Sequence, residues 1–419
     1  MKNLPVFLMG CGGVGRQLLQ HIVSCRSLHA KQGVHLRVVG VCDSKSLVVV
    51  ADVLIAELDD SFLLEVCRVK SNGSSLQTLA NSGVCQVFSG PEVIGKVIDI
   101  GLLGKSTGLA FVDCSASAET IGVLNQVVDF GCCVVLANKK PLTVPMEDYD
   151  KLVSRPRRLR HESTVGAGLP VIASLNRIIS SGDPVYRIIG SLSGTLGYVM
   201  SEVEYGRPFS QVVNAAKSLG YTEPGSLSST NSARGIEKKL LRMTVAPERV
   251  THMRIVPKLT ALLRHDRLDP RDDLGGMDVA RKALILARLL GRRLNLDNMK
   301  IESLYPEEMG PDVMPLEDFL VNGLPLLDQK IEDRIKQASA NGNVLRYVCL
   351  IDDARCEVGI QEVSKDSALG RLRGSDNVVE IYSRCYEKQP LVIQGAGAGN
   401  DTTAAGVLAD ILDIQDLFP

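Results

Sequence analysis

The sequence has few aromatic side chains, almost no net charge and no long apolar runs. Aromatic residues make up 4% of the 419 residues and hydrophobic residues 45%, so its two or three packed lobes would have mainly aliphatic cores. Lysine and arginine number 47 against 48 aspartate and glutamate, which excludes a global positive field for nucleic acid or an anionic membrane. No apolar run approaches the roughly 18 residues that span a bilayer. These absences favour a globular protein whose partner is a small molecule.

Cysteine pairs and a targeting segment are also missing. The eleven cysteines are scattered without a C-x-x-C pair, so we expect neither a disulfide framework nor a zinc site. Only Met-Lys-Asn-Leu precedes the first apolar run, and no Arg/Ser-rich presequence exists. We therefore expect reduced thiols and a cytoplasmic location.

A glycine-rich turn follows the first apolar run. Residues 5–9 predict a strand, and apolar residues at helical spacing from 14 to 23 predict a helix after the turn. Such a turn binds a dinucleotide when Gly10 allows the tight bend, Gly12 lets the backbone approach the pyrophosphate, and Gly15 lets the helix pack on the strand. The N-terminal N–H groups of the helix then face the phosphates. We expect the cofactor to contact Gly10, Gly12, Gly13, Val14 and Gly15.

An acidic residue ends the next predicted strand. The apolar run at 36–42 stops at Asp43, where a ribose hydroxyl would bind. An acidic residue there favours NAD, but Ser44 and Lys45 could instead bind the 2′-phosphate of NADP, so the choice stays open. The alternative is a glycine-rich turn without a ligand, in which Asp43 merely starts a loop.

The strand–helix alternation continues beyond residue 100. Residues 109–114 and 132–137 predict strands on either side of a helix over 119–130, which implies a parallel sheet with right-handed crossovers. Ligands bind such sheets beyond the carboxyl ends of the strands, where Ser115 and Lys139 fall. Lys139 would then face the nicotinamide or the substrate. Alone, it could equally be a solvated surface charge.

Five motifs in the second half carry a resemblance to a known family. They are His161-Glu-Ser-Thr-Val-Gly-Ala-Gly-Leu-Pro-Val-Ile172, Gly190-Ser-Leu-Ser-Gly-Thr-Leu-Gly-Tyr198, Gly220-Tyr-Thr-Glu-Pro224, Asp269 to Lys282, and Gln394-Gly-Ala-Gly-Ala-Gly399. With these motifs in this order, the chain resembles homoserine dehydrogenase from about residue 5 to its C-terminus. The resemblance implies reduction of L-aspartate 4-semialdehyde to L-homoserine with NADPH or NADH.

A carboxylate and a lysine are spaced for joint contact with a substrate. Asp278 and Lys282 are four residues apart on a predicted helix and so share a face. A lysine in such a cleft can donate a proton to a carbonyl that receives hydride. The alternative is an ordinary exposed salt bridge worth about 0.3–0.5 kcal/mol. The resemblance implies that Lys282 is the general acid/base and that the substrate contacts Gly194, Thr195, Tyr221, Glu223, Asp273 and Asp278. Lys139 is the second catalytic candidate because of its position at a strand end.

The resemblance also implies a second group of ligand contacts and a domain plan. Gly399 would touch the cofactor, and oxygens of Glu162, Val165, Ala167 and Leu169 would hold a structural sodium ion. We expect an α/β fold, with a Rossmann-type doubly wound parallel sheet and a second α+β domain for catalysis and dimerisation. The cofactor domain would comprise 1–160 completed by about 398–419, the catalytic domain 161–343, and the strands of a homodimer 344–397.

We expect a monofunctional form, because the sequence contains neither an aspartokinase nor a regulatory amino-acid-binding domain. Feedback inhibition by threonine is not implied. Aldehyde dehydrogenases that form a thioester need a nucleophilic cysteine with a basic partner, and no cysteine–histidine pairing indicates one. Cys114, Cys132 and Cys133 are expected to be buried structural thiols.

The sequence departs from the family between two of its motifs. Relatives run from Tyr-Thr-Glu-Pro directly into Asp-Pro-Arg-Asp-Asp, whereas residues 225–268 intervene here. One hypothesis is a retained intron or annotation error, and the other is a real, looped-out insertion, since closure entropy grows slowly with loop length. If the segment separates Glu223 from Asp273, the alternative function is that of an inactive variant or a non-catalytic NAD(P)-binding regulator.

Overall fold

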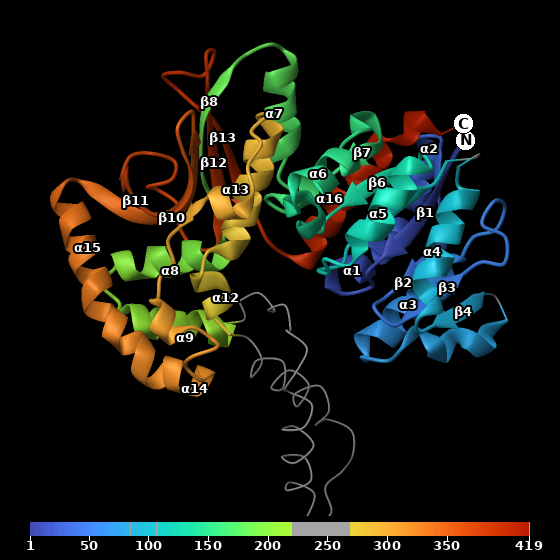
Figure 1. The fold of residues 1–419 in the computed structure, drawn as a ribbon, viewed down its shortest axis with the longest axis horizontal. Coiled ribbons are helices and arrows are strands. Elements are labelled where there is room, and N and C mark those ends of the chain that lie inside the picture. The colour runs from blue at the N-terminus through green and yellow to red at the C-terminus, as the bar shows by residue number, and fades with distance from the viewer. Residues whose placement is uncertain (84, 106–107, 220–268, 419) are drawn as a thin grey trace, which may run out of the picture.

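The computed structural model describes residues 1–83, 85–105, 108–219 and 269–418, which form two lobes side by side (Figure 1). The chain begins and ends in the first lobe, so the N- and C-termini lie close together. Tyr221, Glu223 and the segment 225–268 fall outside the described residues.

The first lobe is built on a seven-stranded sheet. Its spatial order is β4-β3-β2-β1-β5-β6-β7, and β2, β1, β5, β6 and β7 are parallel, which confirms the predicted parallel sheet. The strands β3 and β4 form an antiparallel edge that the sequence did not predict, because the short link after Asp43 permits a hairpin but no crossover helix. The strand bounds are β1 Lys2–Met9, β2 Val34–Cys42, β3 Ser46–Val49, β4 Gln86–Ser89, β5 Ala110–Asp113, β6 Cys133–Leu136 and β7 Leu159–Arg160.

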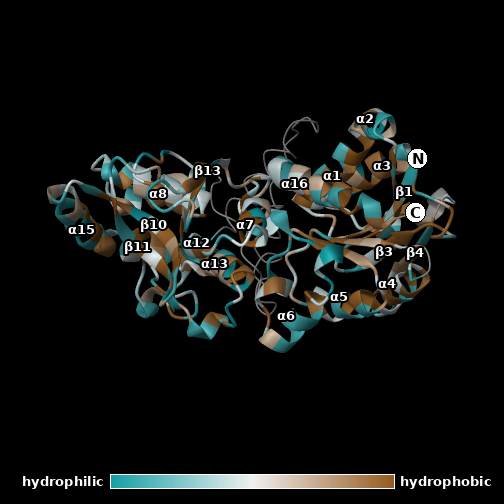
Figure 2. Cartoon of the chain, turned by 90° about the horizontal axis from the view of Figure 1, so that it is seen from above, coloured by the Kyte–Doolittle hydropathy of each residue, from teal (hydrophilic) through white to brown (hydrophobic). Residues whose placement is uncertain are grey.

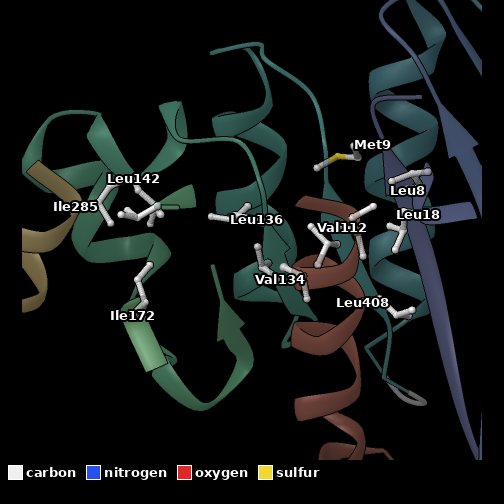
Figure 3. Close-up of a cluster of buried hydrophobic side chains, with 14 of the residues drawn as sticks. Leu8, Met9, Leu18, Val112, Val134, Leu136, Leu142, Ile172, Ile285 and Leu408 are labelled. Carbon is white, nitrogen blue, oxygen red and sulfur yellow. The ribbon is translucent and has the colours of Figure 1, made fainter. Parts of the chain in front are cut away.

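Helices cover both faces of this sheet, and the hydrophobic strands run between the helix layers (Figure 2). On one side lie α1 (Gly13–Ser24), α2 (Arg26–Lys31) and α3 (Asp60–Ser71), and on the other α4 (Glu92–Leu103), α5 (Thr120–Asp129) and α6 (Met146–Leu152). The last helix, α16 (Asn400–Asp413), packs beside α1, where Gln17 and His21 both bond Asp401. Leu18 and Leu408 from these two helices join the same buried cluster (Figure 3).

The second lobe is built on a mainly antiparallel sheet in the order β13-β12-β8-β10-β11-β9. Side chains of β10 alternate, so that Tyr347 and Cys349 enter the main core while Val348 and Leu350 join a smaller cluster on the other face. The strand bounds are β8 Val185–Ser191, β9 Lys300–Ile301, β10 Asn343–Asp352, β11 Cys356–Ser364, β12 Asp376–Ser383 and β13 Leu391–Ala396. The helices are α7 Val171–Ser180, α8 Gly194–Glu204, α9 Phe209–Leu219, α12 Arg271–Leu274, α13 Met277–Leu289, α14 Leu316–Asp318 and α15 Asp328–Ala340.

The strand β8 pairs with β10 on one side and β12 on the other. The sheet therefore combines a strand from the segment expected to be catalytic with the strands expected to form a dimer. None of the helices in the described part of the chain is long and apolar enough to cross a membrane.

The helix α13 joins the two lobes. Ile285 of α13 and Leu142 of the first lobe lie together in the buried cluster (Figure 3). Polar contacts extend the junction, since Arg281 donates to the Thr143 hydroxyl at 3.1 Å and Arg293 forms an ion pair with Asp150 of α6 at 2.7 Å. Arg281 and Ile285 thereby hold α13 against the segment that follows β6, whereas Arg293 reaches α6.

Candidate active site

The glycine turn between β1 and α1 has the geometry of a phosphate-binding turn. Gly10 has a φ of +90°, and a Cβ there would lie 2.5 Å from the backbone nitrogen of Ser115. A Cβ on Gly15 would lie 2.1 Å from the Gly10 carbonyl oxygen, so both positions require glycine. A Cβ on Gly12 would meet no atom within 4 Å. Gly12 therefore leaves open space beside the N-terminus of α1, which suits the approach of a pyrophosphate.

The neighbouring positions of the turn face other elements of the first lobe. A Cβ on Gly13 would lie 2.5 Å from the side chain of Asn400, the first residue of α16. Gly399, which precedes that helix, has a φ of +125°. Val14 is partly buried against the core. The predicted cofactor residues from the two ends of the chain thus meet at one edge of the sheet.

Asp43 lies at the end of β2, as expected, and its carboxylate is held by four donors. One oxygen accepts hydrogen bonds from the backbone of Lys45 and from the backbone and hydroxyl of Ser46, and the other binds the Lys70 ammonium at 2.7 Å. Burial opposes ionisation, but these bonds, led by that from Lys70, keep the pKa of Asp43 below its usual value. Sequence reasoning missed Lys70, because no local pattern links α3 to the end of β2.

A buried polar network underlies Ser115. Asp113 is fully buried and accepts bonds from the Ser115 backbone and the Thr120 hydroxyl, both at 2.8 Å. The Asn138 amide donates to Asp113 at 3.0 Å, to the Ser115 hydroxyl at 3.2 Å and to the Ser117 carbonyl at 2.7 Å. Burial raises the pKa of Asp113. The network connects the loop after β5 to the loop that carries Lys139. The sequence offered one signal for this network, because polar residues stand at the ends of two buried strands.

Lys139, Asp278 and Lys282 come together where the two lobes meet. Asp278 binds Lys139 Nζ through one oxygen at 2.8 Å and Lys282 Nζ through the other at 2.7 Å. Lys282, with 7% of its side chain exposed, also donates to the Leu192 carbonyl at 2.7 Å. Burial opposes ionisation of Asp278, but the charges of Lys282 and Lys139 hold the pKa of its carboxyl well below its usual range. The site therefore presents two ammonium groups around one persistent carboxylate.

Of the other predicted substrate residues, the structure describes Gly194, Thr195 and Asp273, which lie on helices next to this cluster in the chain. Gly194 begins α8, two residues beyond the carbonyl that binds Lys282, and Thr195 follows it as a buried residue. A Cβ on Gly194 would approach the Ser375 carbonyl to 3.1 Å, so this helix start needs a small residue. Asp273 is buried in α12, which leads through two glycines into α13. Tyr221 and Glu223 lie outside the described residues.

The segment expected to hold sodium forms a tight turn against α16. The Glu162 carboxylate accepts bonds from the backbone of Ile172 and Ala173, both at 2.7 Å. Ala167 has a φ of +57°, a left-handed conformation that is unusual for alanine. Val165 is buried and Leu169 is partly buried. Among the residues that the structure describes, no group of three or more histidine, cysteine or acidic side chains could hold a metal ion.

None of the eleven cysteines is in a disulfide. Burial raises the pKa of Cys114 strongly and raises that of Cys132 to about 12. A thiol with so high a pKa is a poor nucleophile at neutral pH. This argues against a dehydrogenase that forms a thioester on either residue.

Three features together define the class of protein to which this fold belongs. They are the parallel sheet with its glycine turn, the second sheet beside it, and the lysine–aspartate cluster at their junction. They describe a two-lobed Rossmann-type protein with an α+β second lobe, a plan suited to NAD(P)-dependent chemistry. A hyperthermophilic archaeal homoserine dehydrogenase, solved in complex with NADPH, has the same fold, with a TM-score of 0.65 at 20% identity over 100% of this chain and 99% of that one.

The particular family follows from the sequence comparisons. The family described as homoserine dehydrogenase matches residues 170–233 and 266–412. The homoserine dehydrogenase of Emericella nidulans is 36% identical over 299 residues, which cover 68% of this chain and 69% of the relative. The chain belongs to the homoserine dehydrogenase family.

One relative is much longer than this chain. The bifunctional aspartokinase/homoserine dehydrogenase of Haemophilus influenzae is 30% identical over 415 residues, which cover 98% of this chain and 43% of the relative. This chain thus spans less than half the length of that curated relative.

Proposed function

We propose that this protein reduces L-aspartate 4-semialdehyde to L-homoserine with NAD(P)H, a step toward threonine, methionine and isoleucine. The observation that carries the proposal is the cluster of Lys139, Asp278 and Lys282, in which both ammonium groups bind one carboxylate. It lies where a lobe with a dinucleotide-type turn meets a lobe with a buried acidic residue for the substrate, Asp273.

The two lysines and Asp278 have different roles at the substrate carbonyl. Lys282, nearly buried and oriented by the Leu192 carbonyl, donates the proton to the aldehyde oxygen as the carbon is reduced. Lys139 completes the positive environment for the charge that develops on that oxygen. Asp278 remains ionised between them and fixes both side chains. Glu223, Asp273 and Asp278 hold the amino-acid end of the substrate, next to Gly194, Thr195 and Tyr221.

The residues of the first lobe fit a nicotinamide dinucleotide. The space beside Gly12 is what a pyrophosphate requires, and Ser115 and Gly399 flank the same edge of the sheet. When bound, the reduced nicotinamide supplies the hydride. Asp43 supports binding of the adenosine ribose, while Lys70 beside it offers a positive charge for the 2′-phosphate of NADP. We propose that either cofactor binds.

Three further proposals concern a bound cation, the domain plan with its dimer, and the location in the cell. The left-handed Ala167 supports a cation on the oxygens of Glu162, Val165, Ala167 and Leu169, because strained backbone is often stabilised by a ligand. The resemblance supports a homodimer through strands of 344–397, with 1–160 plus about 398–419 as the cofactor domain and 161–343 as the catalytic domain. A cytoplasmic location accords with the lack of disulfides among the eleven cysteines.

The decisive experiment is absorbance at the nicotinamide band with L-homoserine and NADP or NAD. It is run on the full chain and on a version that joins Pro224 to Asp269. Turnover in both means that residues 225–268 are tolerated, and turnover only in the shortened chain means that they inactivate the enzyme. Cofactor binding without turnover in either chain would replace the proposal with the second candidate, a non-catalytic NAD(P)-binding regulator.

A further inference from the structure

Six residues after Lys282 on the same helix, a buried arginine contacts the first lobe. Arg288 has a relative exposure of 5%, and its guanidinium donates to the Leu142 carbonyl at 2.8 Å and to the Val144 carbonyl at 2.9 Å. It also donates twice to the Leu294 carbonyl, at 3.1 and 2.8 Å, and to the Asn295 side chain at 3.0 Å. All three of its nitrogens therefore have acceptors, as a buried guanidinium requires.

Two of the carbonyls that Arg288 binds, those of Leu142 and Val144, belong to the segment that begins at Lys139. Leu142 closes the turn after Lys139, because its N–H donates to the Lys139 carbonyl at 3.1 Å. The ring of Tyr149, farther along the first lobe, stacks 4.5 Å from the guanidinium. The arginine thus links the lobe that carries Lys139 to the helix that carries Lys282.

The lysine–aspartate cluster depends on this link. Asp278 binds both lysines only if α13 and the segment from Lys139 keep their relative position to a fraction of an ångström. The ion pair between Lys139 and Asp278 joins the ends of two side chains that are each more than a fifth exposed, so by itself it does not fix the two backbones. The bonds of Arg288 are buried and bind backbone, so they set that relative position directly.

Resting on the proposed function, we infer that Arg288 is a positioning residue for the reaction. It fixes the segment after Lys139 against α13, so that both lysines converge on Asp278. It touches neither substrate nor cofactor and acts through the backbone of Leu142 and Val144.

Arg293 provides a matched control on the same side of the molecule. It also crosses from the second lobe to the first, where it binds Asp150 through two nitrogens at 3.0 and 2.7 Å. Its side chain is 64% exposed and, within the described part of the chain, it donates to the Asp150 carboxylate alone. Arg293→Gln removes an interlobe charge pair without releasing the backbone after Lys139.

The test compares Arg288→Lys with Arg293→Gln. Lysine keeps the charge but cannot bind several carbonyls at once. We expect Arg288→Lys to lower kcat by about ten- to a hundredfold, since small misplacements have effects of that size, while the dissociation constant for NADPH changes less than about twofold. The pH profile of kcat should also shift, because Lys139 loses its bond to Asp278, while Lys282 keeps its own bond within α13. Guanidinium chloride should restore part of the activity of Arg288→Ala, and ammonium chloride should not.

Amide hydrogen exchange gives a readout that does not require turnover. Arg288→Lys should speed exchange at Leu142 and Thr143 but leave the glycine turn at Gly10 unchanged. If the parent chain has no turnover with homoserine, the proposed function fails while the exchange data still decide the role of Arg288. If Arg288→Lys fails to fold, Tyr149→Ala, which removes only the stacked ring, should show the same exchange pattern with a smaller loss of kcat. Kinetics and exchange equal to those of Arg293→Gln would overturn the inference.

Discussion

The glycine turn of the first lobe is formed by neighbouring residues, whereas the lysine–aspartate cluster is formed by residues far apart in the chain. The turn is one continuous stretch from Gly10 to Gly15, and the two glycines that its geometry requires, Gly10 and Gly15, contact its own backbone and Ser115 just after β5. The cluster joins Lys139 to Asp278 and Lys282 from different lobes. A local site can be recognised from spacing, whereas a site between lobes exists only when the lobes are correctly docked.

The two regions should therefore respond differently to substitution. Changes in the turn should act on cofactor affinity or on the stability of the first lobe, and changes in the cluster should act on the chemical step. A substitution that affected both equally would contradict this division.

The largest effect is expected in the cluster. Lys282→Ala removes the proposed proton donor, so kcat should fall by roughly 10²- to 10⁴-fold while the affinity for NADPH stays unchanged. Stopped-flow turnover and a fluorescence titration of NADPH separate the two quantities. Lys336→Ala is the control, because that lysine is 65% exposed and pairs only with a neighbour on its own helix. Loss of NADPH binding in Lys282→Ala would mean that Lys282 also contributes to cofactor binding.

Two glycines of the turn should give contrasting results. Gly12→Val adds a side chain to open space, so the melting temperature should hold while the dissociation constant for NADPH rises by about ten- to a hundredfold. Gly10→Ala adds a Cβ that collides with the Ser115 backbone at a φ of +90°, so it should destabilise the lobe by about 1–3 kcal/mol. Calorimetry and NADPH titration distinguish the two variants. Equal losses of stability in both would show that Gly12 is structural.

The smallest effect on turnover is expected in the helix that closes the first lobe. Asp410 of α16 is buried beside Glu162, Asp413 and Arg160, and burial raises its pKa from 3.8 to about 8. The folded protein therefore keeps a proton that the unfolded chain loses, and the resulting stability is present below pH 3.8 and is lost as the pH rises toward 8.

Asp410→Asn should remove that dependence, since the amide oxygen can still accept the bond from the Glu162 backbone. Its stability relative to the parent should increase from pH 5 to pH 8 by up to about 1.4 kcal/mol per unit, as measured by urea unfolding. kcat should stay unchanged, because the cluster lies elsewhere. A constant difference across this pH range would mean that Asp410 titrates normally.

Much of the fold could be predicted from periodicity. The strand at 36–42, the helix over 119–130 and the helix that carries Asp278 and Lys282 all occur where the apolar spacing indicates them. The antiparallel strands β3 and β4 were not predicted, because each has only four residues, too few to show a clear alternation. Lys70 and Asn138 were missed, because each finds its carboxylate only through tertiary contact.

The sequence by itself determined the dinucleotide turn, since glycine spacing and the flanking periods of strand and helix are local properties of the chain. It also placed Asp278 and Lys282 on one face, because helical geometry sets the four-residue spacing. Only the tertiary structure decided that Lys139 shares their carboxylate, that Lys70 holds Asp43, and that Arg288 secures the junction of the lobes. Those contacts join residues far apart in the chain, and their geometry comes from how buried surfaces pack, which no local pattern records.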